Sequence, residues 1–294
     1  MLNSYYEAID RASGGAADLL AQNQGPIRPT FDLGDVQFES TKEPEERKPT
    51  VKVGIDFAAV DGGDERNDGN SVKFSIEPAQ PLIKRGNFSA NINGAVTINN
   101  VTTPDGSKAS NTIYTVGAKG GWELSKDTSV YTGLSFDLRE NHGDQGRKGP
   151  DSWGAYTSVG VKQKLVDSEG FSLTGDASLQ AAFFGDFEDD TPNSTDTIRP
   201  TVSLAGTIPL YQSQDEKHTV TTTGTAFLQK RIPFGSESNS ATVASYKQSI
   251  DYKNSNGLTG GVYAIGTASG VTSSEFRGGN QPGIVGGVNI GYSF

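Results

Sequence analysis

The sequence predicts an all-β protein: an up-and-down antiparallel transmembrane β-barrel of about twelve strands, with a short N-terminal helix and linker ahead of it. Three observations support this prediction. From residue 51 onward, apolar side chains recur at every second position, as in strands with one apolar face. Several alternating runs last about 12–16 residues, whereas strands of soluble sheets usually have about five or six. The connections between the runs alternate between short and long, as in barrels that cross a membrane.

The composition agrees with a barrel and excludes several other classes of protein. Only 33% of the 294 residues are hydrophobic and 37 are glycine, which suits a barrel because each strand needs apolar atoms on one side only. No run of about 18 apolar residues is present, so transmembrane helices are excluded. The absence of cysteine excludes disulfides and thiolate metal or redox sites. The net charge of -10 argues against general nucleic-acid binding.

Residues 1–50 form a segment of a different kind, separate from the predicted barrel domain of residues 51–294. Ser4 and Glu7 have the spacing of a capping box, and apolar residues then recur at roughly helical spacing until a Gly-Pro pair ends the pattern. The polar, acidic stretch that follows predicts a solvated linker on the periplasmic side; a plug or docking helix at the barrel mouth is the alternative. The first 24 residues lack the features of a secretory signal. Either a signal was removed or none existed, as would suit a bacteriophage virion protein.

Six alternating rows occupy the first half of the predicted barrel, at residues 51–57, 72–76, 88–98, 114–124, 130–138 and 153–165. The first row, V-K-V-G-I-D-F, shows the pattern most simply, because every apolar side chain in it is separated from the next by a charged residue or a glycine. In the third row, asparagine and serine alternate with the apolar side chains. Aromatic residues such as Tyr114, Trp122 and Trp153 lie near row ends, where barrels that cross a membrane carry interfacial girdles.

The second half continues with six more rows, at residues 171–183, 198–210, 220–228, 244–252, 258–264 and 284–294. The third of these alternates with a ladder of threonines, and β-branched side chains favour strands. The row around 244–252 is the least regular. The two halves together predict about twelve strands.

Short and long connections alternate along the chain. The turn-forming sequences S-K-D-T, D-S-E-G and N-S-N-G join the fourth row to the fifth, the sixth to the seventh and the tenth to the eleventh, and they predict tight hairpins. Longer polar stretches lie between other rows, among them E-N-H-G-D-Q-G-R-K-G-P-D. With an even number of strands, this order predicts long loops at one end of the barrel. Both ends of the barrel region then lie with the short turns at the other end.

The last row carries the most specific pattern. In I-V-G-G-V-N-I-G-Y-S-F, which ends at Phe294, apolar side chains and one glycine occupy every even position. An amphipathic strand that stops on an aromatic carboxy-terminus resembles the closing strand of bacterial outer-membrane β-barrels. The resemblance extends over the strand pattern of residues 51–294 and rests on no family-specific motif. It implies a location in the bacterial outer membrane, contact with membrane lipid, and an assembly signal for the outer-membrane assembly machinery at Ile290, Tyr292 and Phe294.

Alternation assigns residues to the two faces of the predicted barrel. The apolar rows predict lipid-facing residues, among them Ile92, Val116, Trp122, Leu134, Leu204 and Ile290. The opposite rows predict basic residues that line the lumen, among them Lys52, Lys73, Lys119, Arg139, Lys162, Lys164, Arg199, Arg231 and Lys247. With Lys217 and Lys253 they outnumber the acidic residues of the same rows, so the wall is expected to be net basic and to favour anions. The alternative is that these charges pair across strands and cancel.

No catalytic or metal-binding constellation stands out in the sequence. The two histidines, His142 and His218, have no metal-ligand spacing. A twelve-stranded outer-membrane phospholipase would need a serine two residues after its histidine, and the matching positions hold Asp144 and Val220. We therefore expect neither an enzyme nor a cofactor.

The simplest function is porin-like: a passive channel for small solutes or ions, compatible with a homo-oligomer. The layout is also similar to the translocator domain of autotransporters, which has twelve strands after a helix, but no passenger domain is expected within residues 1–50. Two further alternatives stay open. One is a signal-less bacteriophage virion protein of the tail or ejection apparatus with a porin-like barrel, and the other is a soluble β-sandwich or fibre binding module.

Overall fold

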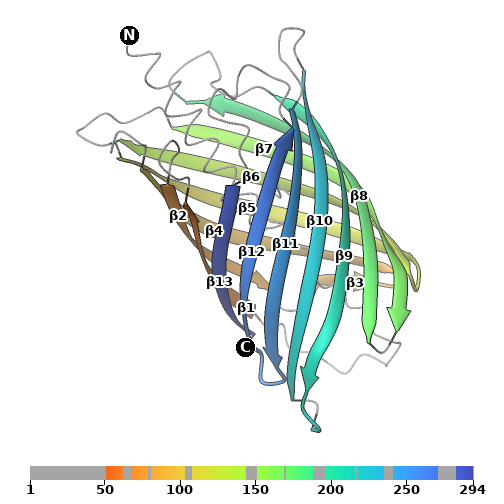
Figure 1. Ribbon diagram of the computed structural model, residues 1–294. Coiled ribbons are helices and arrows are strands. Elements are labelled where there is room, and N and C mark those ends of the chain that lie inside the picture. Colours follow the sequence, from red (N-terminus) through yellow and green to blue (C-terminus); the bar gives the residue numbers. More distant parts are fainter. Residues whose placement is uncertain are drawn as a thin grey trace.

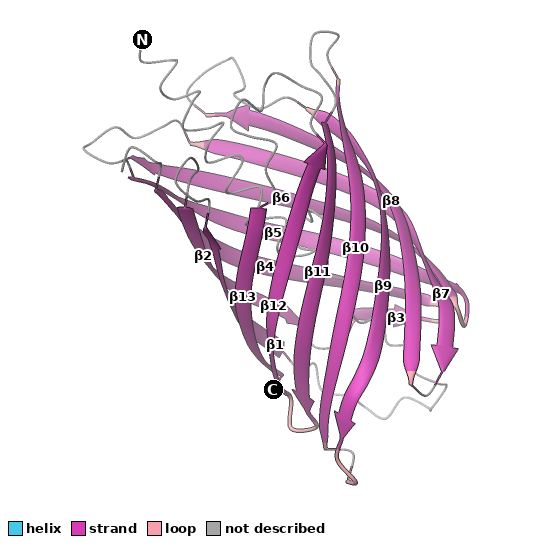
Figure 2. Ribbon diagram, in the orientation of Figure 1, coloured by secondary structure: helices cyan, strands magenta, loops and turns pink. Residues whose placement is uncertain are grey.

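The computed structural model describes residues 51–61, 68–78, 81–102, 108–143, 151–168, 170–187, 196–215, 217–234, 241–270 and 283–293. The predicted N-terminal helix and linker at 1–50 and the terminal Phe294 lie outside these ranges. Figure 2 shows the described part as strands joined by turns. None of the described residues forms a helix with the length and hydropathy needed to cross a membrane.

The strands of the described part follow the predicted rows and extend most of them. Their bounds are β1 (Val51–Asp61), β2 (Asp68–Pro78), β3 (Ile83–Arg85), β4 (Phe88–Thr102), β5 (Lys108–Ser125), β6 (Thr128–Gly143), β7 (Ser152–Ser168), β8 (Phe171–Asp186), β9 (Thr197–Gln212), β10 (His218–Pro233), β11 (Ala241–Asn254), β12 (Leu258–Gly270) and β13 (Gly283–Ser293).

Twelve of these strands close into a single antiparallel ring. Each long strand pairs with the next one along the chain, and β13 returns to pair with β1. The short strand β3 is not one of the twelve: it pairs with the start of β4, while β2 pairs directly with the rest of β4. Figure 1 shows the strands inclined to the axis of the barrel, as closure of a sheet requires. The predicted barrel of about twelve strands is confirmed, and a single closed ring is not the pair of packed sheets that forms a β-sandwich.

The closing pair, β1 with β13, joins the two ends of the barrel region. Its register runs without a shift from Lys52 opposite Ser293 to Asp61 opposite Ile284. From Lys52 to Phe57 and from Val288 to Ser293 both strands alternate apolar with polar or small residues, so side chains of one kind fall on the same face in both. Closure removes the two free edges of the sheet, whose backbone groups would otherwise lack partners.

One end of the barrel carries the short turns. The turns from β5 to β6, β7 to β8, β9 to β10 and β11 to β12 lie at this end, together with the carboxy-terminal end of β13 (Figure 1). This is the arrangement that the connection lengths predict. The predicted long connections begin later than expected, because strands extend into them. His142 is an example: we predicted it in a loop, yet it belongs to β6, and its Nε2 lies 3.3 Å from Thr112 Oγ1 of β5.

Strand β3 was not predicted, because a run of three residues shows no periodicity. It forms a tight hairpin with the start of β4, in which Ile83 pairs with Ala90. The turn contains Gly86 with a φ of 59°, a left-handed conformation that favours glycine. The hairpin has a clear role in the sheet: β2 reaches β4 only as far as the pair Ile76–Gly94, and β3 pairs with the part of β4 that precedes it.

Apolar side chains cover the outside of the ring and polar side chains its inside. On the outer face, Val116 and Leu134 are 60% and 61% exposed. On the inner face, polar residues such as Asn111, Ser129 and Ser135 are buried. This is the inverse of a water-soluble protein, in which large apolar side chains fill the interior and wide apolar patches are rare outside. It is the pattern of a barrel whose outer surface contacts lipid.

Aromatic pairs lie near both ends of the outer face. At the short-turn end, the ring centroids of Phe88 and Trp122 are 4.8 Å apart. Toward the opposite end, the rings of Phe136 and Trp153 stack at 6.2 Å. Such aromatic bands mark the two membrane–water interfaces in transmembrane barrels.

Candidate functional site

The inner wall of the barrel is the candidate functional site, because the polar and charged side chains of the strands converge on it. The residues predicted to face lipid lie on the opposite, outer face, where each is exposed: Ile92, Val116, Trp122, Leu134, Leu204 and Ile290. The basic residues predicted to line the lumen belong to the inner rows: Lys52, Lys73, Lys119, Arg139, Lys162, Lys164, Arg199 and Lys247. Arg231 lies in β10, but its side chain is outside the described part.

Lys217 departs from the prediction because it lies in a turn, between β9 and β10, rather than on the wall. Its Nζ lies 3.2 Å from Asp215 Oδ2. The Ser213 hydroxyl donates to Asp215 Oδ1 at 2.6 Å, and this bond, followed by those from Lys217, holds the pKa of Asp215 below its usual value. Local side-chain hydrogen bonds of this kind stabilise turns. Lys217 therefore adds no charge to the inner wall.

Several wall charges pair across strands, as the alternative interpretation of the sequence proposes. Lys52 Nζ lies 3.1 Å from Glu77 Oε1 on the neighbouring strand. Lys162 stands directly opposite Asp176 in the register of β7 with β8. Directly opposed side chains in a sheet are about 5 Å apart at their Cβ atoms, close enough for opposite charges to compensate. Pairing thus reduces the positive charge that a simple count assigns to the wall.

Two other basic residues of the wall stand opposite neutral side chains in the strand register. Lys119 of β5 stands opposite Asn91, and Arg199 of β9 stands opposite Gln180, so neither faces an acid in these pairs. Arg199 is buried against the wall. Its Nε donates to Thr197 Oγ1 at 2.7 Å, which fixes the guanidinium against the wall.

A cluster of Asp56, Tyr263 and Lys247 lies at the closing seam of the barrel. The Tyr263 hydroxyl donates to Asp56 Oδ1 at 2.7 Å, and Lys247 Nζ lies 4.5 Å from the centroid of the tyrosine ring. Tyr263 is only 6% exposed. Its ring lies over Gly287 of β13, where any Cβ would overlap it. The cluster therefore ties β1, β11, β12 and β13 together through hydrogen bonding, cation–π contact and close packing.

A second cluster surrounds Asp137 of β6. Thr115 of β5 and Tyr156 of β7 donate hydrogen bonds to its carboxylate, and Arg139 and Lys73 are the cations that face it. One of its oxygens, Oδ1, is buried without a hydrogen-bond partner among the described residues. Compensation of this carboxylate therefore depends on the two cations as well as on the two hydroxyls.

The aromatic residues of the inner wall were missed by the sequence analysis. The missed residues are Tyr131, Tyr156, Phe184, Phe227 and Tyr263. The Tyr131 hydroxyl donates to both oxygens of Asp176, at 2.9 and 3.0 Å, and Arg199 Cζ lies 5.4 Å above the ring of Phe184. Parity alone could have found them, since each occupies a position of the polar row in its strand.

Hydroxyl side chains line the wall on β9 and β10. Thr207 and Thr223 contact each other at 3.0 Å, and Gln229 Nε2 donates to Thr201 Oγ1 at 3.1 Å. From Thr201 to Thr225, the inner row of these two strands carries no charged side chain. This side of the wall is neutral and hydrophilic, and the charged clusters lie mainly on other strands.

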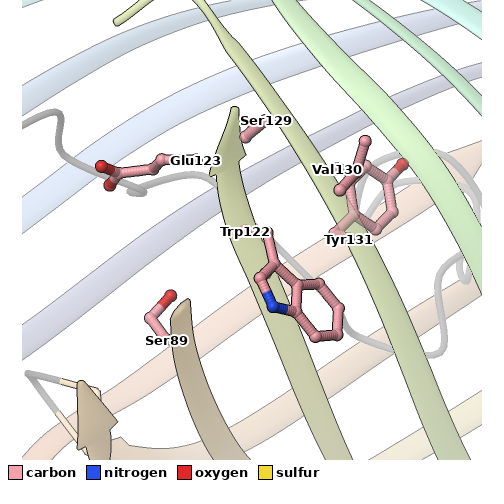
Figure 3. Close-up of a pocket in the computed structure, with 7 residues that line it drawn as sticks. Ser89, Trp122, Glu123, Ser129, Val130 and Tyr131 are labelled. Carbon is pink, nitrogen blue, oxygen red and sulfur yellow. The ribbon is translucent and has the colours of Figure 1, made fainter. Parts of the chain in front are cut away.

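A shallow recess opens in the wall at the short-turn end of β4, β5 and β6 (Figure 3). It is lined by Ser89, Gly121, Trp122, Glu123, Ser129, Val130 and Tyr131. Its small residues make room, and Glu123 is its only charged group. Neither a histidine nor a second carboxylate lines the recess beside Glu123.

Both histidines contact hydroxyl side chains. His218 Nδ1 lies 2.8 Å from the Tyr252 hydroxyl, and the two rings stack at 6.0 Å. His142 contacts Thr112. Across the described ranges, no three His, Cys, Asp or Glu side chains are grouped so that they could hold a metal ion. What the described inner wall can do is bind and orient polar groups by hydrogen bonding and charge.

Similarity to known proteins is confined to the fold. No protein-family model and no curated protein sequence matches the chain. Among solved structures, the beta domain of the Bordetella autotransporter BrkA matches with a TM-score of 0.59 at 10% identity, over 84% of this chain and 100% of that one. The translocator domain of the autotransporter NalP from Neisseria meningitidis matches with 0.56 at 13% identity, over 98% and 100%. LpxR from Salmonella typhimurium matches with 0.51 at 8% identity, over 83% and 100%. The chain has the fold of outer-membrane β-barrels.

Proposed function

We propose that this chain is a bacterial outer-membrane protein whose barrel encloses a narrow aqueous pore for small solutes and ions. The observation that supports this most directly is the division between the two faces of one closed ring. The outer face carries the large apolar side chains, and the inner face carries lysines, arginines, carboxylates and hydroxyls. Water solvates a polar inner face, whereas contact of that face with lipid costs free energy. A water-filled interior and a lipid-covered exterior therefore suit the two faces.

The side chains of the inner wall restrict the pore to small solutes. Tyr263, Phe227 and Arg199 are long side chains that are buried on the wall, which indicates close packing around them. The hydroxyl-lined part of β9 and β10 offers hydrogen bonds in place of those that a solute loses when it sheds water. We propose passive diffusion of small hydrophilic solutes along this wall.

The charge distribution supports a mild preference for anions. Part of the basic wall is compensated, as in the Lys52–Glu77 pair. Basic residues outnumber acidic ones on the inner rows of the described strands, which leaves a positive surplus. In a narrow, low-dielectric wall such charges act on permeating ions more strongly than charges in bulk water.

Conductance across a planar bilayer tests the proposed pore. We expect stepwise increases in current when refolded, detergent-solubilised protein is added, and a reversal potential in a salt gradient that corresponds to mild anion selectivity. Detergent without protein is the control for leakage. Protein that is folded by its heat-modifiable migration on a gel, yet produces no steps, would contradict the pore.

The carboxy-terminal strand is proposed to direct assembly through the outer-membrane assembly machinery. Ile290 and Tyr292 lie on the exposed outer row of β13, and Phe294 continues that row in the sequence. We expect deletion of Phe294 to lower the amount of heat-modifiable protein in the outer-membrane fraction several-fold, because the row that identifies the strand is shortened. Substitution of Ser293 by threonine, on the other face, is the matched control. Wild-type levels after the deletion would contradict the signal, and a virion protein would leave even the wild type outside this fraction.

A further inference from the structure

Lys73 of β2 lies between two carboxylates of the inner wall. In the register of β1 with β2 it stands directly opposite Asp56, and it is one of the two cations that face this acid. It also faces Asp137 of β6, although β4 and β5 separate the two strands. A lysine side chain has four methylene groups, and its ammonium can therefore extend along the wall.

The strands between β2 and β6 leave space for this reach. At the level next to Lys73, the register passes from Ser75 to Ala95 of β4, then to Thr115 of β5 and to Asp137 itself. Each of the three intervening side chains is small. Ala95 is buried on the wall, so the surface there is covered. Thr115 donates a hydrogen bond to Asp137, and the charges of Lys73 and Arg139 also act on this carboxylate.

Five charges of the inner wall, which include the two acids and the cations that act on them, alternate in sign around the ring. In strand order they are Lys247 of β11, Asp56 of β1, Lys73 of β2, and the pair Asp137 and Arg139 of β6. Lys73 is the member between the two acids. Removing it leaves Asp56 with Lys247 and Asp137 with Arg139, and each of these cations also lies at an end of the series.

We infer that Lys73 is the specificity-determining residue of the proposed pore, because it compensates Asp56 and Asp137 together. This inference rests on the pore proposed above. With Lys73 present, these five charges, from Lys247 to Arg139, are net positive and repel cations. Without Lys73, the two carboxylates act on permeating ions from the same region of the wall, and small cations are favoured over anions.

The test compares two substitutions that remove the same charge. Lys73→Gln is expected to lower the anion-to-cation permeability ratio several-fold, measured by reversal potential in a salt gradient. Lys52→Gln is the matched control, because Lys52 lies on the inner row of a neighbouring strand, near the short-turn end, and pairs with Glu77. It should change the ratio much less. Lys73→Arg should keep the wild-type ratio. Equal shifts for Lys73→Gln and Lys52→Gln would overturn the inference, since net charge alone would then explain them.

A second measurement does not depend on conductance. Lys73→Gln should lower the midpoint of thermal unfolding in detergent, and adding Asp56→Asn or Asp137→Asn should restore part of the loss, because each removes one carboxylate that Lys73 compensates. Strictly additive losses in both double variants would overturn the link between Lys73 and the two acids. A wild-type protein without conductance that still shows this coupling would refute the pore and keep the link.

Discussion

Leu204→Arg is expected to destabilise the folded barrel by roughly 2–4 kcal/mol, whereas Ser203→Arg at the adjacent position should cost little. Leu204 lies on the outer row of β9, where it is exposed, so an arginine there would enter hydrocarbon. Ser203 lies on the inner row, directly opposite Asp176, where a guanidinium finds water and a carboxylate. The two positions share a strand and a depth in the membrane, and differ in the face that they occupy.

Equilibrium refolding from urea into lipid vesicles measures this difference, with tryptophan fluorescence as the signal of insertion. Equal free energies of unfolding for the two variants would contradict the assignment of faces. Ser135 is a less suitable control than Ser203, although it also lies on an inner row. It is buried on the wall beside Tyr156 in the register of β6 with β7, so an arginine there would have to displace its neighbours.

Tyr263→Ala is expected to cost about 3 kcal/mol of folding free energy, the range found when a large buried ring is truncated. The substitution removes three interactions at the closing seam: the ring over Gly287, the cation–π contact with Lys247, and the hydrogen bond to Asp56. Tyr263→Phe separates them. It keeps the ring and deletes the hydroxyl, so it should cost less, about 1.5–2 kcal/mol, the net contribution of a hydrogen bond to a charged group.

The same refolding assay measures both tyrosine variants, and Tyr292→Phe on the outer face of β13 is the matched control for loss of a hydroxyl. A Tyr263→Ala barrel as stable as the wild type would show that the seam is held by backbone pairing alone. A Tyr263→Phe barrel as unstable as Tyr263→Ala would assign the effect to the hydrogen bond rather than to packing over Gly287.

Much of the candidate site could be predicted from the sequence, because the facing of a strand residue is a local property. Successive side chains alternate between the two faces whatever the rest of the chain does. Val116 and Leu134 could therefore be assigned to one face, and Lys119 and Asp137 to the other, from the neighbouring residues alone. The same rule places the aromatic side chains of Tyr131 and Tyr263 on the inner wall, although the rows of apolar residues do not include them.

The pairing of wall charges could not be predicted in this way. Which acid a lysine faces depends on the register of neighbouring strands. Shifts in register add up from strand to strand around the ring. A shift of one residue, such as the irregularity between Lys164 and Val166 in β7, changes every later pairing on one side. Lys217 shows a second limit, since a residue near a strand end belongs to the wall or to a turn according to where pairing stops.

From the sequence alone one obtains the barrel class, the strand count to within one short strand, the end at which the short turns lie, and the face of most strand residues. These features follow from alternation and from turn-forming residues, which act over a few positions. Three features are visible only in the folded structure: how the ring closes, how β3 pairs with the first residues of β4, and which side chains meet on the wall. Asp56 of β1 and Tyr263 of β12, separated by 207 residues, are in contact because β13 pairs with both strands. Closure is a property of the whole sheet, so no local sequence pattern specifies which distant side chain a wall residue will contact.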